Sequence, residues 1–162
     1  VAVTFFAVIF AIWPLSHLVL LRELAPLGAQ WTMFVFICTW VTDSAAYLTG
    51  NAMGSKALAP KVSPKKTVEG FIGGIIGGAL AASIMWVIYF RQQGVDFAET
   101  VILGGVGLGV IGQLSDLVES MLKREAKVKD SSTVLPGHGG FLDRFDSYLL
   151  AAPLLYYYLV LR

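Results

Sequence analysis

The chain has 162 residues, of which 56% are hydrophobic and only 14% are charged, with a formal net charge of +1. Soluble domains carry about 25% charged residues, so this composition argues against a soluble protein and predicts an integral membrane protein. A soluble helical core would also need polar outer faces, which most of the apolar runs lack.

Five apolar segments are long enough to cross a hydrocarbon core of about 30 Å, which takes about 20 helical residues. Runs such as YLLAAPLLYYYLVL lack the alternation of a barrel strand, so the segments are expected to be helices. The predicted fold is therefore an all-α, polytopic transmembrane helix bundle. Its expected spans are 1–21, 30–50, 67–90, 97–118 and 141–161.

The chain begins inside an apolar run, VAVTFFAVIF, without a starting Met, a charged segment or a small-residue cleavage site. A signal peptide is therefore not predicted, and an N-terminal part of the protein is expected to be missing. Residues 1–162 are expected to form one transmembrane domain. The single cysteine, Cys38, cannot form an intrachain disulfide and is expected to be a small buried residue.

Basic residues gather in the loops after the second and fourth spans, and the positive-inside rule places both loops in the cytoplasm. The opposite side holds only Arg22, Arg91 and Arg162. The basic residues of the two loops are Lys56, Lys61, Lys65, Lys66, Lys123, Arg124, Lys127 and Lys129.

Four acids then fall toward the cytoplasmic ends of their spans, namely Asp43, Asp116, Asp143 and Asp146. The outer halves of the spans are expected to hold no acid. Ionisable groups at the edge of a bilayer core are costly, so these acids are candidates for function.

The spacing of these acids predicts a cation site. Asp143 and Asp146 are three residues apart and would share one helix face, and Asp116 would share a face with Glu119 and Ser120. Close carboxylates repel one another in a poor dielectric unless a cation lies between them. Two or three carboxylates with hydroxyl and water ligands suit Mg²⁺.

An ion-pair network is the alternative explanation, for example Asp143 or Asp146 with Arg144 or a loop lysine. Asp43 could ligate the cation, bind substrate or cap a helix. Glycines in GxxxG spacing in the third and fourth spans favour close helix packing, and a phosphate-binding role is not expected for them. They are Gly73, Gly74, Gly77, Gly78, Gly105 and Gly109.

A second polar segment, SPKKTVEG at residues 63–70, lies at the entrance to the third span. Helix N-termini attract anions, so Lys65 and Lys66 placed there suit a phosphate group. The alternative is a polybasic surface for anionic lipid head groups. Both interpretations hold if the substrate is itself an anionic lipid.

The loop LPGHGGF combines glycines with His138 just before the last span. Gly139 and Gly140 allow a ligand to approach the backbone closely, and His138 could hydrogen-bond a phosphate or move a proton. His17, by contrast, lies in the first span and is expected to be a packed polar residue. Cations, metal and phosphate sites together predict phosphate chemistry.

The segment SMLKREAKVKDSSTVLPGHGGFLDRFD, residues 120–146, resembles the signature of the phosphatidate cytidylyltransferases, also called CDP-diacylglycerol synthases. SPKKTVEG and WVTDSAAYLTG are similar to other parts of that family. The resemblance covers roughly residues 40–147. It implies a membrane catalytic domain that converts CTP and phosphatidate to CDP-diacylglycerol and pyrophosphate, at the inner membrane of a bacterium and facing the cytoplasm.

The resemblance also implies roles for particular residues. Asp116, Asp143 and Asp146 would hold Mg²⁺, with or without a second cation, and with Lys123 would form the catalytic centre. Membrane lipids and a second copy of the chain, in a homodimer, are the implied partners beside the substrates, and no nucleic acid is expected. The basic residues, His138 and its glycines are implied to bind substrate, and Asp43 and Ser63 are expected to do so as well. The full set of expected substrate-binding residues is Asp43, Ser63, Lys65, Lys66, Lys123, Arg124, Lys129, His138, Gly139 and Gly140.

Two other functions remain open at this point. One is a CTP-dependent enzyme that acts on another lipid, an isoprenoid ether phospholipid or a polyprenol. The other is a cation transporter, whose buried acids would be expected across the full membrane depth. A purely structural membrane subunit would not need the lysine, glycine, histidine and aspartate loop.

Overall fold

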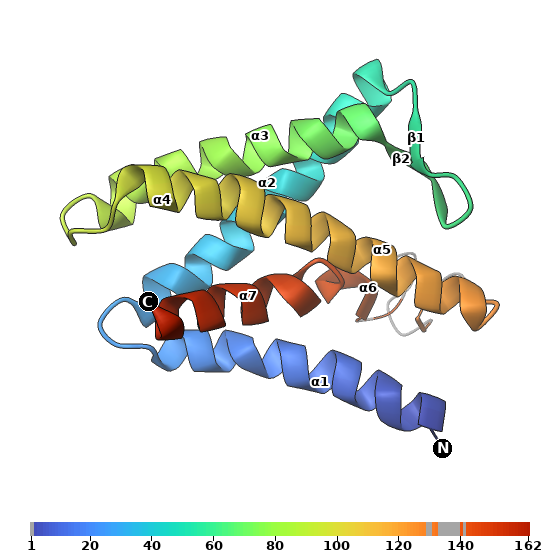
Figure 1. Ribbon diagram of the computed structural model, residues 1–162, viewed down its shortest axis with the longest axis horizontal. Helices are drawn as coiled ribbons and strands as arrows, with labels where there is room; N and C mark the ends of the chain where they lie inside the picture. Colours follow the sequence, from blue (N-terminus) through green and yellow to red (C-terminus); the bar gives the residue numbers. More distant parts are fainter. Residues whose placement is uncertain (1, 129–130, 133–139, 141) are drawn as a thin grey trace.

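The computed structural model describes residues 2–128, 131, 132, 140 and 142–162 of the chain, which are mostly helical (Figure 1). The chain folds into long helices with one short hairpin between the second and third. In order, the elements are α1 (Ala2–Glu23), α2 (Gly28–Met53), β1 (Ala57–Ala59), β2 (Ser63–Thr67), α3 (Val68–Met85), the π-helical turn η1 (Trp86–Phe90), α4 (Phe97–Ile102), the π-helical segment η2 (Leu103–Leu108), α5 (Gly109–Glu125), α6 (Leu142–Phe145) and α7 (Tyr148–Leu161).

Two helices in the described part of the chain are long and apolar enough to cross a membrane, Val68–Phe90 and Phe97–Glu125. They agree with the third and fourth expected spans. The expected spans at 1–21, 30–50 and 141–161 correspond to α1, α2 and α7, but the number of five spans stays a prediction.

The all-α prediction was wrong at residues 57–67, where β1 and β2 form an antiparallel hairpin. Ala57 lies opposite Thr67, and Ala59 lies opposite Ser63. Thr67 ends β2 and caps α3, because its hydroxyl accepts a hydrogen bond from the Gly70 amide at 3.1 Å. The hairpin therefore leads directly into the N-terminus of α3.

Close packing of α2 against α3 depends on small residues, as the GxxxG spacing predicts. A Cβ atom added to Gly78 would lie 2.6 Å from the Thr42 hydroxyl and 2.9 Å from the Gly104 carbonyl oxygen. A Cβ atom on Gly74 would lie 2.9 Å from the Gln113 amide nitrogen. Glycine is thus required for the approach of α2, α3 and α5, and the expectation of a packing role is confirmed.

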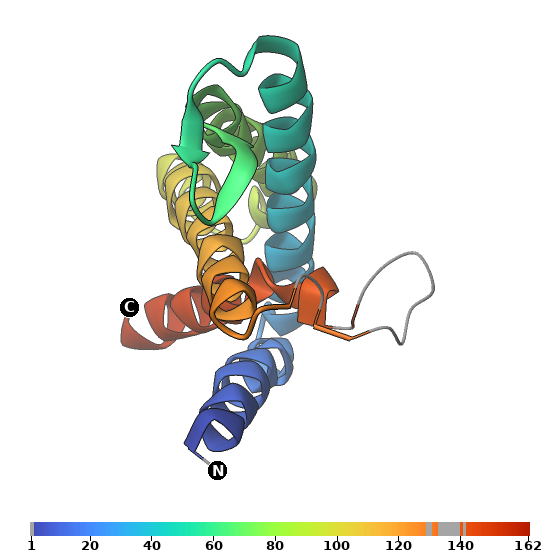
Figure 2. The ribbon, with the colours of Figure 1, turned by 90° about the vertical axis from the view of Figure 1, so that its right-hand side faces the viewer.

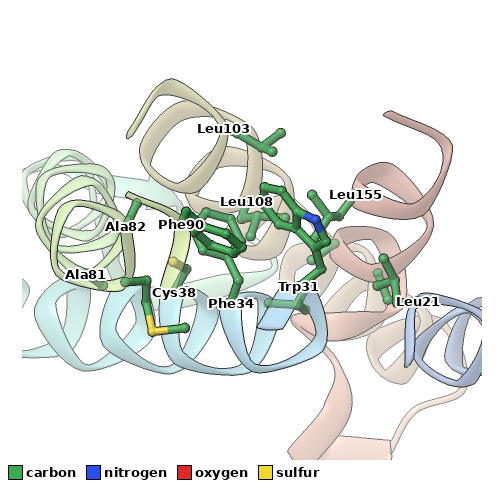
Figure 3. Packing of buried hydrophobic residues seen from close by; sticks show 14 residues of the cluster. Leu21, Trp31, Phe34, Cys38, Ala81, Ala82, Phe90, Leu103, Leu108 and Leu155 are labelled. Atoms are coloured by element: carbon green, nitrogen blue, oxygen red, sulfur yellow. The ribbon is translucent and has the colours of Figure 1, made fainter. Parts of the chain in front are cut away.

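The hydrophobic core lies where the first half of α2 meets η1, η2 and α7 (Figure 3). Trp31 stacks on Phe90 with ring centroids 4.2 Å apart, and Phe34 meets both rings edge-on. Cys38 is buried in this core, as expected. His17 is 2% exposed and its Nδ1 lies 2.8 Å from the Trp13 carbonyl oxygen, which confirms a packed polar residue.

The fifth apolar segment is not one continuous helix. The chain forms the single turn α6, passes through a turn at Asp146 and Ser147, and then begins α7 at Tyr148. The Ser115 hydroxyl bonds to the Asp146 carbonyl oxygen and also accepts a hydrogen bond from the Leu150 amide at 3.3 Å. These contacts with α5 replace helical hydrogen bonds at the break, so Asp143 and Asp146 precede the apolar helix.

Candidate functional site

A cavity of about 360 Å³ opens between the hairpin, the C-terminal half of α2, the start of α3 and α5. Figure 2 shows the hairpin in front of the start of α3 and beside the C-terminal end of α2. The lining of the cavity combines cationic, acidic and amide side chains with a few apolar ones. The lining residues are Asp43, Ala46, Tyr47, Gly50, Asn51, Leu58, Lys65, Lys66, Thr67, Gly70, Phe71, Gln113, Asp116, Asp146 and Ser147.

An ion pair joins the hairpin to α5 across this cavity. Nζ of Lys66 lies 2.5 Å from Oδ2 of Asp116, and both side chains are about a quarter exposed. The other oxygen of Asp116 accepts a hydrogen bond from the Ser120 hydroxyl at 3.3 Å, which agrees with the shared helix face predicted for these two residues. Lys66 and Asp116, which are 50 residues apart in the chain, therefore belong to one site.

Three carboxylates gather beside this ion pair. One oxygen from each of Asp116, Glu119 and Asp146 lies within 4.8 Å of the other two. Burial and, after it, the neighbouring Asp116 carboxylate raise the pKa of Asp146 to about 7. Carboxylates at this separation repel one another, and a divalent cation between them would remove the repulsion.

Glu119 is the most buried member of this carboxylate cluster, with 1% of the residue exposed. The Lys123 ammonium lies 2.6 Å from its Oε2 atom, but neither carboxylate oxygen receives a hydrogen bond of good geometry from the described residues. A buried carboxylate that lacks hydrogen bonds is costly unless a cation compensates it. The Lys123 ammonium compensates this charge in part, and Glu119, as one of the three clustered carboxylates, also fits a ligand of a divalent cation.

Asp143 lies outside the cluster of three and serves instead as an anchor for the chain before α6. Its carboxylate accepts hydrogen bonds from Lys123 Nζ at 2.8 Å, the Ser131 amide at 2.9 Å and the Gly140 amide at 2.6 Å. Burial alone would raise the pKa of Asp143, but these hydrogen bonds outweigh burial and hold the pKa well below its ordinary value.

The sequence had predicted that Asp143 and Asp146 share one helix face. This prediction was wrong, because α6 ends at Phe145, before Asp146. Asp143 belongs to α6 and points to Lys123, whereas Asp146 follows α6 and contributes to the carboxylate cluster. The role of Asp143 as a metal ligand stays a prediction.

The structure brings some of the other predicted substrate-binding residues to this cavity. Lys65 lines it with Lys66 and Asp43, whereas Ser63 begins β2 beyond the lining residues. Arg124 donates a hydrogen bond from Nε to the Val62 carbonyl oxygen at 3.3 Å and so ties the hairpin tip to α5. Lys129, His138 and Gly139 lie outside the described residues.

Several lining residues were not predicted from the sequence. Gln113 is 7% exposed, and its Nε2 atom donates to the carbonyl oxygens of Gly109 at 2.8 Å and Phe71 at 3.2 Å. A glutamine one turn before Asp116 in an otherwise apolar helix was the available signal. Tyr47 and Asn51 also line the cavity, and their spacing of one and two helical turns after Asp43 on α2 was the signal for them.

The expectation that the outer halves of the spans hold no acid was wrong. Glu99, in the first turn of α4, lies 2.7 Å from the Arg162 guanidinium and accepts a hydrogen bond from the Tyr158 hydroxyl. This acid is paired and connects α4 to the end of α7. It is not among the residues that line the cavity. Its contacts account for it as a structural residue.

The charges of the site fit a divalent cation. When all are ionised, Asp116, Glu119, Asp143 and Asp146 carry four negative charges, which the ammonium groups of Lys66 and Lys123 only halve. The oxygen-only donor set favours Mg²⁺ over softer metals. A cavity that also presents two lysines can hold a phosphate group next to that cation.

Comparison with known proteins gives one consistent result. The sequence model of a family described as "Cytidylyltransferase family" matches residues 1–162. The chain is 41% identical over 141 residues to a phosphatidate cytidylyltransferase of Bacillus subtilis, covering 87% of the chain and 51% of that protein.

Two further proteins carry the same name. The Synechocystis protein is 45% identical over 84% of the chain and 45% of its own length. The Staphylococcus aureus protein is 48% identical over 79% of the chain and 48% of its own length. The chain thus spans about half the length of the curated relatives that it matches.

Proposed function

The chain belongs to the cytidylyltransferase family, and we propose that the complete protein transfers the cytidylyl group of CTP to phosphatidate, which gives CDP-diacylglycerol and pyrophosphate. The names of the relatives support this reaction. The observation that carries the proposal is the cavity in which the lysines of β2 meet the carboxylates of α5 and the turn at 146.

The cofactor in this proposal is Mg²⁺, with or without a second cation. Among the described residues, it would be held by Asp116, Asp146 and the buried Glu119. Asp143 is linked to this cluster by Lys123, whose ammonium pairs with both Glu119 and Asp143. When bound, Mg²⁺ would neutralise phosphate oxygens and stabilise the charge that develops on the leaving group.

In the proposed reaction, a phosphatidate oxygen forms a bond to the α-phosphorus of CTP, and the bond from that phosphorus to the pyrophosphate oxygen breaks. The attacking oxygen is already anionic, so no strong general base is needed. The main obstacle is repulsion between two highly charged substrates. Lys65 and Lys66 would reduce it by binding phosphate oxygens at the start of α3, in a partly dehydrated site.

The position of the cavity supports a site at the membrane surface. We propose that α1, α2, the helix Val68–Phe90, the helix Phe97–Glu125 and α7 are five membrane spans. The hairpin and the end of α5, with their lysines, would then face the cytoplasm at the level of the lipid head groups. The membrane would be the inner membrane of a bacterium, and the protein would act as a homodimer.

Turnover of CTP and phosphatidate by the complete protein, purified in detergent with saturating Mg²⁺, tests the proposal. Asp146→Asn keeps the size of the side chain and removes one negative charge of the cluster, so we expect turnover to fall at least about a hundredfold. A near-normal rate would remove Asp146 from the proposed centre.

The same assay with a different acceptor tests the choice of lipid. Phosphatidate should be used in preference to an isoprenoid ether phospholipid or a polyprenol. Faster use of either alternative acceptor would assign the protein to another CTP-dependent lipid reaction.

A further inference from the structure

We propose that Lys66 exchanges partners: its ammonium neutralises Asp116 before a divalent cation binds, and the cation releases it to a substrate phosphate. This inference rests on the proposed function and deepens it. It makes metal binding and phosphate binding at the site mutually dependent.

The Lys66 ammonium already lies beside the carboxylate cluster. Its Nζ lies 2.5 Å from Oδ2 of Asp116, and Asp116 is one of the three residues of the carboxylate cluster. Nζ of Lys66 is buried and makes no hydrogen bond of good geometry in the described part of the chain. The ion pair with Asp116 is therefore its main compensation, and that compensation is lost if Asp116 turns to a metal.

The Lys66 ammonium and a divalent cation would compete for the same carboxylate, Asp116. A cation held by Asp116, Glu119 and Asp146 would sit within a few ångströms of the Lys66 ammonium, because all three carboxylates lie within 4.8 Å of one another. Two cations at such a distance repel each other strongly in a partly buried site. The buried Glu119 carboxylate, which has the Lys123 ammonium 2.6 Å from Oε2, adds a third negative charge to the cluster and so favours the divalent ion at this position.

The cavity gives the released ammonium a place to bind phosphate. Lys66 lines the cavity together with Lys65, one residue before the threonine that caps α3. A lysine has a flexible four-carbon stem, so the ammonium can leave Asp116 without movement of β2. The cavity then offers two free ammonium groups and a helix N-terminus to a phosphate.

Metal binding by Lys66→Met tests the exchange, with free Mn²⁺ followed by electron paramagnetic resonance in the absence of substrate. Met keeps an apolar stem and removes the competing charge, so we expect the variant to bind Mn²⁺ about tenfold more tightly than the wild type. Lys65→Met is the matched control, since Lys65 has no ion pair to an acid among the described residues, and its Mn²⁺ affinity should stay within about twofold. Unchanged or weaker Mn²⁺ binding by Lys66→Met would overturn the proposal.

A second measurement uses the wild-type protein and does not depend on how a variant folds. Amine-reactive labelling, quantified by mass spectrometry at each lysine, should increase at Lys66 when Mg²⁺ is added and decrease again when CTP follows. Labelling of Lys61, which is exposed at the hairpin tip, should not respond to Mg²⁺. Mg²⁺ that protects Lys66, or leaves its labelling unchanged, contradicts the exchange.

These outcomes separate the exchange from the proposed function. If Asp146→Asn abolishes Mn²⁺ binding and turnover while Lys66→Met binds Mn²⁺ as the wild type does, the metal centre stands and the exchange fails. If the wild type binds no Mn²⁺ and Asp146→Asn retains turnover, the metal centre itself fails.

Discussion

The helix bundle has an apolar end and a charged end, which differ in how they affect stability. At one end, α2, η1, η2 and α7 bury an aromatic and aliphatic cluster around Trp31, Phe34 and Phe90 (Figure 3). At the other end, α2, α3 and α5 surround a cavity lined by lysines and acids. The first end gains stability from close packing, whereas the second keeps buried charges whose repulsion is only partly compensated.

Small residues make both ends possible. Glycines at 74, 77 and 78 let α3 pack closely against α2. The relative position of these two helices therefore does not depend on the charged residues of the cavity. The charged end therefore does not need to hold the fold together. We infer that substitutions at the two ends separate activity from stability.

The largest expected effect comes from Asp116→Asn. This change removes one carboxylate of the cluster and leaves the Lys66 ammonium without its ion-pair partner. We expect turnover of CTP and phosphatidate to fall about a thousandfold, because such charges act on the transition state. Thermal unfolding of the purified protein should change little.

Glu125→Gln is the matched control for this variant, since Glu125 is exposed at the end of the same helix. Its turnover should stay within about twofold of the wild type, as expected for a surface charge. A thousandfold loss in both variants would show that the charged end stabilises α5 and does not act on substrate.

The converse variant is Phe34→Ala in the apolar end. Phe34 is fully buried and meets the rings of Trp31 and Phe90 edge-on. Removal of a buried phenyl ring leaves a cavity and costs about 3–5 kcal/mol of stability. We expect a much lower unfolding temperature in detergent, with a wild-type KM for CTP in the protein that remains folded. A raised KM at normal stability would mean that the two ends are coupled.

Glu119→Gln should have a smaller effect that is confined to the metal. The substitution keeps shape and volume, and Lys123 retains Asp143 as a partner. Loss of one carboxylate from the cluster should weaken Mn²⁺ binding about tenfold to a hundredfold, by analogy with the loss of groups that support a metal site. Mn²⁺ affinity equal to that of the wild type would leave Glu119 as a partner of Lys123 only.

Much of the apolar end could be predicted from the sequence, because its signals are local. Hydropathy predicted spans at 67–90 and 97–118, which agree with the observed helices Val68–Phe90 and Phe97–Glu125, and the glycine spacing predicted the close helix contacts. His17 and Cys38 were correctly expected to be packed residues, since both lie inside predicted apolar spans. Such features depend on residues within one or two helical turns.

The charged end depends on contacts between distant segments, and these the sequence predicted only in part. The lysines at 65 and 66 and the acids at 116 and 146 were recognised as candidates, but their pairing needs the tertiary fold. Glu119 was noted only as sharing a face with Asp116. Glu119 lies near Asp146 because α6 ends at Phe145, and Ser115 of α5 stabilises this break. No proline or glycine at the break would have predicted it from the sequence.

The hairpin was missed for a related reason. Residues 54–67 read as a polar loop with Pro64, and a five-residue strand between two long helices carries little hydrophobic pattern. Its conformation is fixed from outside, by Arg124 at the tip and by Glu69 at the base.

The smallest expected effect tests this attachment at the base. The Glu69 carboxylate accepts hydrogen bonds from the amides of Ser55 and Lys56, at 3.1 and 3.3 Å, and from the Ser55 hydroxyl. Glu69→Gln should loosen the segment that leads into β1, and the lysines of β2 would then be held less firmly toward the cavity. We expect the KM for CTP to rise about threefold with an unchanged kcat, as expected when one charge-assisted hydrogen-bond set is weakened.

Asp96→Asn is the matched control, because Asp96 caps a helix at the opposite end of the molecule through the Glu99 amide at 2.8 Å. Asparagine also serves as a helix cap, so this variant should keep both the KM and the unfolding temperature of the wild type. If Asp96→Asn raises the KM as much as Glu69→Gln does, caps at both ends act on global stability and the hairpin has no special part in substrate binding. If only Glu69→Gln raises it, the position of the hairpin lysines depends on one carboxylate at the base of the hairpin, which touches neither lysine ammonium.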